Sequence, residues 1–204
     1  MPLTSNQFDA LNELGNIGAA HAATTLSQML NTNIQMTVPE VRLVDIADIH
    51  HHLGDEISAL VVFQIQGELA NGGFVLLNMP GSSAIRMTNT LLGMTDMERG
   101  LSEMDRSALL EIGNIMVSSF LDATAELLGI VMLPSPPNLA IDMPHAAMES
   151  LLAHQAADIN EVVLFKTELT SDEHRIVADL MLLPNPPMLC DILLLLERLL
   201  QPAV

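Results

Sequence analysis

Two sets of polar residues recur along the chain at identical spacing, and each combines a carboxylate with an amide. Each set begins with an acid or a hydroxyl, has a glutamate four residues later, and ends with an asparagine three residues after the glutamate. The two sets are Asp9, Glu13 and Asn16, and Ser107, Glu111 and Asn114. A carboxylate pairs with cations, and an asparagine amide both donates and accepts hydrogen bonds, so each set can bind and orient groups on another molecule.

The two sets belong to an internal duplication. Each asparagine is followed 23 residues later by a proline, Pro39 (39 − 16) in the first copy and Pro137 (137 − 114) in the second. All four matched positions are offset by 98 residues (107 − 9, 111 − 13, 114 − 16 and 137 − 39). A constant offset without gaps indicates two repeats, which we place at approximately 4–93 and 102–201.

Helical spacing would bring each set onto one face. At about 100° per residue, the three polar positions of a set fall within a sector of roughly 60°. The opposite side is apolar in both copies and includes Gly15 and Gly113. A glycine inside a helix costs about 1 kcal/mol relative to alanine, so these two indicate close packing of the helix backbone against a neighbour.

A glutamate and an asparagine on an exposed helix face are usually only a solvated surface. The duplication argues against that reading, because a polar face under no constraint would be expected to differ between the copies, whereas Glu-x2-Asn is the same in both.

The remaining pattern predicts the same order in both halves: a long helix, a strand, two further strands and a short helix. Thr4 with Gln7, and Ser102 with Asp105, have the spacing of capping boxes that start the long helices. We expect long helices ending near Leu30 and Leu128, short helices at 82–92 and 189–200, and strands at 34–46, 57–66, 73–79, up to Ile141, 161–169 and 175–183. The pattern of residues 145–160 predicts no definite element and allows a short helical turn.

Neither half has the means to bury its own apolar face. We therefore predict a single α+β domain over 1–204 with pseudo-twofold symmetry, in which helices cover one face of an antiparallel sheet of about six strands and the two long helices expose the polar sets.

Composition excludes several classes of function. The chain has 25 acidic and 7 basic residues and lacks Tyr and Trp, so nucleic acid and anionic membranes are poor partners, whereas a protein with a basic rim is compatible. No apolar run is long enough to span a membrane, and the first residues lack a secretory pattern. The one cysteine, Cys190, lies in an apolar stretch and is expected to be a buried thiol rather than a nucleophile. We expect a reduced, cytoplasmic protein.

Other candidate chemistry is weak. His50, His51 and His52 are consecutive and therefore point in different directions, so we expect no metal site there. Gly-Asn-Ile-Gly at 15–18 lies inside a predicted helix and lacks the lysine of a P-loop. No serine–histidine–aspartate arrangement or G-x-S-x-G motif is visible.

The paired [Asp/Ser]-x3-Glu-x2-Asn-x22-Pro pattern, within Glu-Leu-Gly-Asn-Ile-Gly and Glu-Ile-Gly-Asn-Ile-Met, resembles the CheC family of chemotaxis phosphatases and the wider CheC/CheX/FliY group. The resemblance covers essentially the whole chain and implies the same α+β fold. One departure is Ala20-His21, where a Gly-Asn pair is expected in close relatives; His21 could alter the rim of the first site.

The resemblance implies a phosphatase acting on a phosphorylated CheY-type response regulator, with Glu13, Asn16, Glu111 and Asn114 as catalytic residues and Asp9, Ser107, Pro39 and Pro137 in support. It implies no cofactor of the chain's own, since the Mg²⁺ belongs to the regulator, and it admits a CheD-type deamidase as a further partner. The alternative is a non-enzymatic adaptor that binds the phosphorylated regulator or CheD. We expect a monomer, because the duplication supplies both halves of a symmetric dimer.

Overall fold

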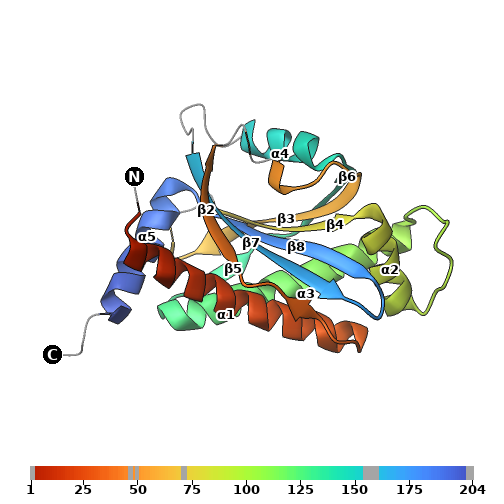
Figure 1. The fold of residues 1–204 in the computed structure, drawn as a ribbon, viewed down its shortest axis with the longest axis horizontal. Coiled ribbons are helices and arrows are strands. Elements are labelled where there is room, and N and C mark those ends of the chain that lie inside the picture. The colour runs from red at the N-terminus through yellow and green to blue at the C-terminus, as the bar shows by residue number, and fades with distance from the viewer. Residues whose placement is uncertain (1–2, 46–47, 49–50, 70–72, 154–160, 201–204) are drawn as a thin grey trace.

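The computed structural model describes residues 3–45, 48, 51–69, 73–153 and 161–200. Two long helices dominate it, and three shorter helices complete the α structure (Figure 1). The helices are α1 (Ser5–Leu30), α2 (Gly81–Leu92), α3 (Glu103–Leu128), α4 (Pro144–Ala153) and α5 (Pro186–Leu200). No described helix has the combination of length and apolar character required to cross a membrane.

Local sequence signals determine where the long helices begin and end. Thr4 and Gln7 form a reciprocal capping box at the start of α1, and Ser102 and Asp105 form the equivalent box at the start of α3. Such boxes satisfy backbone N–H groups that have no partner within the helix. The left-handed conformation of Gly129, with φ of 68°, then ends α3. Both predicted helix starts are confirmed.

The strands form one antiparallel sheet, as the sequence predicts. Its hydrogen-bonded order is β1-β7-β8-β4-β3-β5, while β2 also pairs with β7 and β6 also pairs with β3. The strands are β1 (Gln35–Met36), β2 (Glu40–Asp45), β3 (Ser58–Gly67), β4 (Phe74–Pro80), β5 (Met132–Pro134), β6 (Asn138–Asp142), β7 (Glu161–Ser171) and β8 (Ile176–Leu183).

The first strands of each half of the chain pair with an edge strand of the other half. Strand β2, from the first half, pairs with β7 from the second half, and β6, from the second half, pairs with β3 from the first. The two halves meet in the middle of the sheet through β4 and β8. With the pairings of β1 with β7 and of β5 with β3, five strand pairings join the halves through backbone hydrogen bonds.

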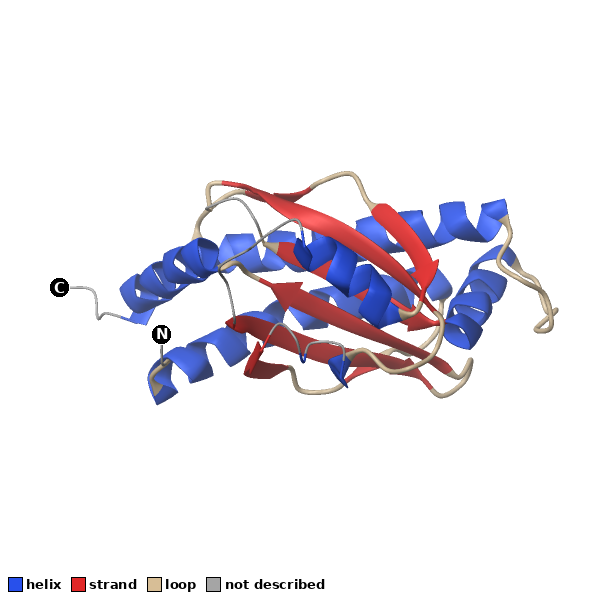
Figure 2. Cartoon of the chain, turned by 90° about the horizontal axis from the view of Figure 1, so that it is seen from above, coloured by secondary structure: helices blue, strands red, loops and turns tan. Residues whose placement is uncertain are grey.

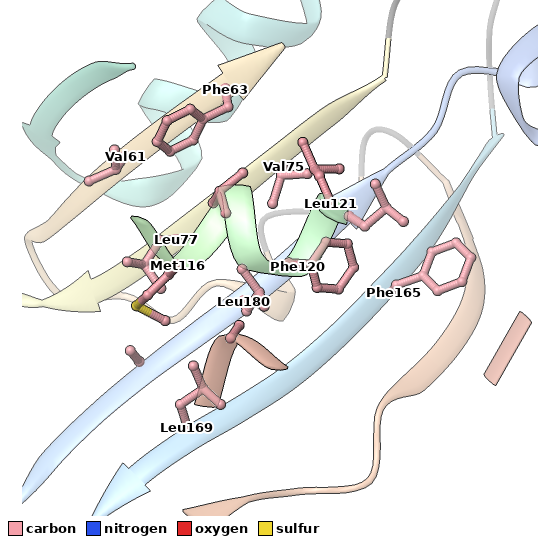
Figure 3. Close-up of a cluster of buried hydrophobic side chains, with 14 of the residues drawn as sticks. Val61, Phe63, Val75, Leu77, Met116, Phe120, Leu121, Phe165, Leu169 and Leu180 are labelled. Atoms are coloured by element: carbon pink, nitrogen blue, oxygen red, sulfur yellow. The ribbon is translucent and has the colours of Figure 1, made fainter. Parts of the chain in front are cut away.

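The main core lies between the sheet and the pair α1 and α3. Along β3, alternate residues Ala59, Val61, Phe63 and Ile65 face this layer, as the two-residue period of a strand requires. Figure 3 shows Met116, Phe120 and Leu121 of α3 packed over side chains of β3, β4, β7 and β8. The apolar sides of both long helices are therefore buried, and their opposite sides remain available to contact another molecule.

Two details differ from the expected sheet with helices on one face. Helix α4 lies on the opposite face from α1 and α3 (Figures 1 and 2), where Met148 packs with Leu60 and Leu76. Those leucines are the residues of β3 and β4 that alternate away from the main core, so a second apolar layer has to be covered. The sheet also has eight strands among the described residues, because the segment around Pro39 is divided into β1 and β2 and the segment up to Ile141 includes both β5 and β6.

The prediction of a buried Cys190 is wrong. The thiol is free and exposed on α5, and Leu194, one turn later, is 55% exposed. An apolar stretch at the edge of the molecule leaves one side of its helix in solvent, which the composition of the stretch does not reveal.

Candidate functional site

The first polar set lies on the solvent side of α1. Asp9 and Glu13 are exposed and Asn16 is half-buried, whereas Leu11 and Leu14 on the other side of the helix are buried. In the part of the chain that the structure describes, no side chain is recorded in a hydrogen bond with Glu13 or Asn16. The carboxylate and the amide are therefore available to another molecule.

The second set repeats this arrangement on α3. Ser107 and Glu111 are exposed and Asn114 is half-buried, so the gradient of exposure along the set is the same. The Ser107 hydroxyl donates to the carbonyl oxygen of Glu103 at 3.0 Å, which leaves its oxygen able to accept a further hydrogen bond. The described residues provide no hydrogen-bond partner for Glu111 or Asn114 either.

Helices α1 and α3 run antiparallel and in contact, which separates the two sets. Gly18 lies against Phe120 and Thr124, whereas Thr25, further along α1, donates to the Ser119 hydroxyl at 2.8 Å. Because the helices run in opposite directions, Asn16 lies level with Thr124 or with residues that follow it on α3, whereas Asn114 precedes Ser119 on that helix. With a rise of 1.5 Å per residue, the two amides are on the order of 15 Å apart along the helix pair. The chain thus presents two separate polar sets, which are two candidate sites.

Each motif glycine lets its helix pack closely against the sheet, at equivalent positions in the two repeats. A Cβ on Gly15 would lie 3.4 Å from Phe165 and 3.5 Å from Pro39, while a Cβ on Gly113 would lie 2.9 Å from Val61. Phe165 pairs with Val41 and Val61 pairs with Leu139, and these two partners are themselves one repeat offset apart (139 − 41). Close packing behind each asparagine, which the glycines predict, is confirmed.

The two motif prolines follow the sites into the sheet. Pro39 is buried beneath Gly15, between β1 and β2, so it packs behind the helix that carries the first set. Pro137 is half-buried immediately before β6, and the structure gives it no contact with Gly113 among the three nearest atoms. The structure therefore shows packing behind the motif glycine for Pro39 only, and the supporting role of both prolines stays a prediction.

A shallow groove of about 480 Å³ runs between the two helices from Asn114. His21 and Thr25 of α1 line it, together with Ser118, Asp122 and Glu126 of α3. The sequence placed His21 at the rim of the first site, and the structure adds that it borders the groove of the second. Sequence spacing holds no signal for this, because the contact depends on how α1 and α3 cross.

A buried ion pair fixes the start of α3. The Asp105 carboxylate is fully buried and accepts hydrogen bonds from Arg99 at 2.5 and 2.7 Å and from the Ser102 backbone at 2.7 Å. Arg99 also donates to the Asn89 side chain of α2 at 2.7 Å. The Arg99 guanidinium holds the pKa of Asp105 well below its usual range, while burial acts in the opposite direction. Sequence reasoning found the cap at Asp105 but missed Arg99.

Metal ligation has little support in the described residues, where no three histidine, cysteine, aspartate or glutamate side chains are grouped to hold an ion. His50 lies outside those residues. His51 Nε2 is 4.0 Å from Asp48, and the His52 carbonyl accepts a hydrogen bond from Lys166 at 2.7 Å. The absence of a metal site at the three histidines stays a prediction.

Comparisons with known proteins agree on one family. A model described as "CheC-like family" matches residues 7–42 and 104–141, the two segments that hold the polar sets. The CheY-P phosphatase CheC of Bacillus subtilis (strain 168) is 30% identical over 190 residues, which are 90% of this chain and 90% of that protein.

Solved structures share the fold. Thermotoga maritima FliY matches with a TM-score of 0.77 and 23% identity over 97% of this chain and 99% of that one. A chain from the CheX-CheY-BeF3-Mg+2 complex of Borrelia burgdorferi matches with a TM-score of 0.55 and 16% identity, over 81% of this chain and 94% of that one.

Proposed function

The chain belongs to the CheC-like family, and on that basis we propose that it is a cytoplasmic phosphatase that accelerates hydrolysis of the phosphoaspartate of a CheY-type response regulator in chemotaxis signalling. The observation that carries this proposal is the pair of exposed glutamate–asparagine sets, one on each of two antiparallel helices. The name of the B. subtilis relative supports the same activity and substrate.

The asparagines are proposed to position the attacking water. Phosphoryl transfer is limited by the placement of the nucleophile and by stabilisation of charge, so an amide that holds one water in line with the phosphorus is sufficient to accelerate it. Asn16 and Asn114 suit this role because each is half-buried against its helix and has no recorded partner among the described residues. Positioning of this kind is worth roughly 10²-fold or more in rate.

The glutamates are proposed to dock the regulator. Response regulators carry a lysine beside the phosphoaspartate. The exposed carboxylates of Glu13 and Glu111, each more than two turns from the start of its helix, can pair with that lysine. Asp9 and Ser107 would make supporting contacts one turn earlier. We expect Glu→Ala at either site to weaken binding more than Asn→Ala does, because the carboxylate makes the charged contact.

The Mg²⁺ required for the chemistry is assigned to the regulator. It neutralises charge on the phosphoryl group there, and this chain is proposed to contribute no cofactor. The division of labour explains why a glutamate and an asparagine suffice: the aspartyl phosphate, the metal and the lysine all arrive with the substrate.

An adaptor that binds the phosphorylated regulator or a CheD-type deamidase without hydrolysis is the alternative. A glutamate would suffice for docking, so the asparagine present in both copies favours the phosphatase.

Steady-state phosphate release separates the two. The purified protein is added to a regulator with a small-molecule phosphodonor and Mg²⁺, and we expect faster release than from the regulator alone. Release at the regulator's own rate, with binding intact, would contradict the phosphatase and support the adaptor.

A further inference from the structure

The second site has an exposed apolar side chain in line with its polar set. Met104, in the first turn of α3, is 64% exposed. At about 100° per residue, Met104, Ser107, Glu111 and Asn114 lie within a sector of roughly 80°. Leu110, half-buried, flanks the same face beside Asn114. A large apolar side chain left in solvent on a proposed docking face is a candidate anchor for the partner.

The first site has polar residues at the equivalent places. One repeat offset earlier, Asn6 replaces Met104 (104 − 98) and Asn12 replaces Leu110 (110 − 98). Asn6 is exposed and lines a groove of about 310 Å³ with Glu197 of α5. The Glu197 carboxylate accepts a hydrogen bond from Gln7 at 3.2 Å.

Exposed carboxylates lie beside both sites. The first set has two, Asp9 and Glu13, and Glu197 lies near the start of the same helix. The second set has one, Glu111, but three more lie close to it: Glu103 one turn before Ser107, and Asp122 and Glu126 in the groove with Asn114. Both sites are therefore acidic, and the exposed apolar side chain of Met104 distinguishes the second.

We propose that the two sites bind the same partner surface, the phosphorylated receiver domain of the regulator, by different means: carboxylates attract it to both sites, and Met104 adds an apolar anchor at the second site alone. This inference rests on the proposed function for the identity of the partner. Apolar contact is insensitive to salt, whereas attraction between exposed charges is screened over about 8 Å at physiological ionic strength.

Binding to an inert mimic of the phosphorylated regulator isolates this property from hydrolysis. The probe is the regulator treated with beryllofluoride and Mg²⁺, and calorimetry gives the Kd. The Glu13→Ala variant leaves the second site for docking, and Glu111→Ala leaves the first. At about 500 mM salt, where attraction between exposed charges is screened, we expect a several-fold lower Kd for Glu13→Ala than for Glu111→Ala, because only the former keeps the site with the Met104 anchor.

The anchor is tested within the same pair. Adding Met104→Asn to Glu13→Ala should raise Kd roughly five- to tenfold, and adding Asn6→Met to Glu111→Ala should lower it. The matched control is Leu194→Asn, which removes an apolar side chain of 55% exposure from a different helix, α5, and should leave Kd unchanged in the Glu13→Ala variant. Circular dichroism and thermal midpoints confirm that each variant is folded.

Either of two results would overturn the inference: an unchanged Kd on Met104→Asn, or a Kd at about 500 mM salt that is no lower for Glu13→Ala than for Glu111→Ala. Its failure is distinct from failure of the phosphatase. Binding that depends on Met104 without any accelerated phosphate release would refute the proposed activity but support the Met104 anchor. Accelerated release with a Kd that is insensitive to Met104 would support the activity and refute the anchor.

Discussion

The two motif glycines occupy equivalent positions in the repeat, yet replacing each by alanine should have opposite effects on stability. Alanine is favoured over glycine inside a helix by about 1 kcal/mol, and both positions gain this. The added Cβ at Gly15 meets Phe165 at 3.4 Å and Pro39 at 3.5 Å, which is ordinary contact. Gly15→Ala should therefore be neutral or more stable by up to about 1 kcal/mol.

The added Cβ at Gly113 instead meets two atoms of Val61, at 2.9 and 3.2 Å. Val61 is fully buried, β-branched and held in β3 between β4 and β6, so neither its side chain nor its backbone can move away easily. Overpacking of this kind costs about 1 to 3 kcal/mol. After the helical gain, Gly113→Ala should be less stable than the unaltered chain by about 0 to 2 kcal/mol.

The helical gain is common to both variants, so the difference between them is the overpacking cost of about 1 to 3 kcal/mol, which corresponds to roughly 2 to 12 °C in Tm for a chain of this size. Urea denaturation and thermal melts of both variants measure it, with the unaltered chain as reference. Relief of the close contact between the added Cβ and Val61 also pushes α3 outward beside Asn114. We therefore expect Gly113→Ala to lose more activity than Gly15→Ala. A Gly113→Ala variant as stable as Gly15→Ala would refute the packing described here.

Three further outcomes follow from the structure. The depressed pKa of Asp105 contributes stability that is fully present above the unfolded value of about 3.9 and is lost as pH falls below it. Asp105→Asn should therefore be less stable than the unaltered chain at pH 7, but should lose less stability than that chain below about pH 5. Free energies of unfolding, measured with urea, that fall in parallel for the two proteins as pH is lowered would contradict this. Metal titration of the isolated protein should show no tight stoichiometric uptake; uptake lost on replacing residues 50–52 would overturn that expectation. Sedimentation at micromolar concentration should show a monomer, because the strand exchange between halves is already made within one chain, and a stable dimer would count against this reasoning.

The local parts of the fold were predictable from the sequence. Thr4 with Gln7 and Ser102 with Asp105 determined where α1 and α3 begin, because capping depends on residues within one turn of each other. The central strands were also predictable from their β-branched and apolar residues. The exchange of β2 and β6 was not, because the choice of strand partner depends on register over the whole sheet.

The same limit applies to the site. The spacing of Glu13 and Asn16, and its repetition at Glu111 and Asn114, predicts two polar faces, and both are found on the solvent sides of the long helices. His21 beside the second groove could not be predicted in this way, because its position follows from packing between segments far apart in sequence. Arg99 is only six residues from Asp105, but a loop rather than a helix period brings it there.

The central claim, that Asn16 and Asn114 position the attacking water, is tested most directly by single-turnover hydrolysis. A pre-phosphorylated regulator is mixed with the unaltered chain, with Asn16→Ala, with Asn114→Ala and with the double variant, and loss of the phosphoryl group is followed in time. Each single variant should retain measurable acceleration, and the double variant should fall to the regulator's own rate. Both side chains lie at the surface, so stability should change by less than about 0.5 kcal/mol. Full activity of the double variant, with unchanged circular dichroism, would contradict the account.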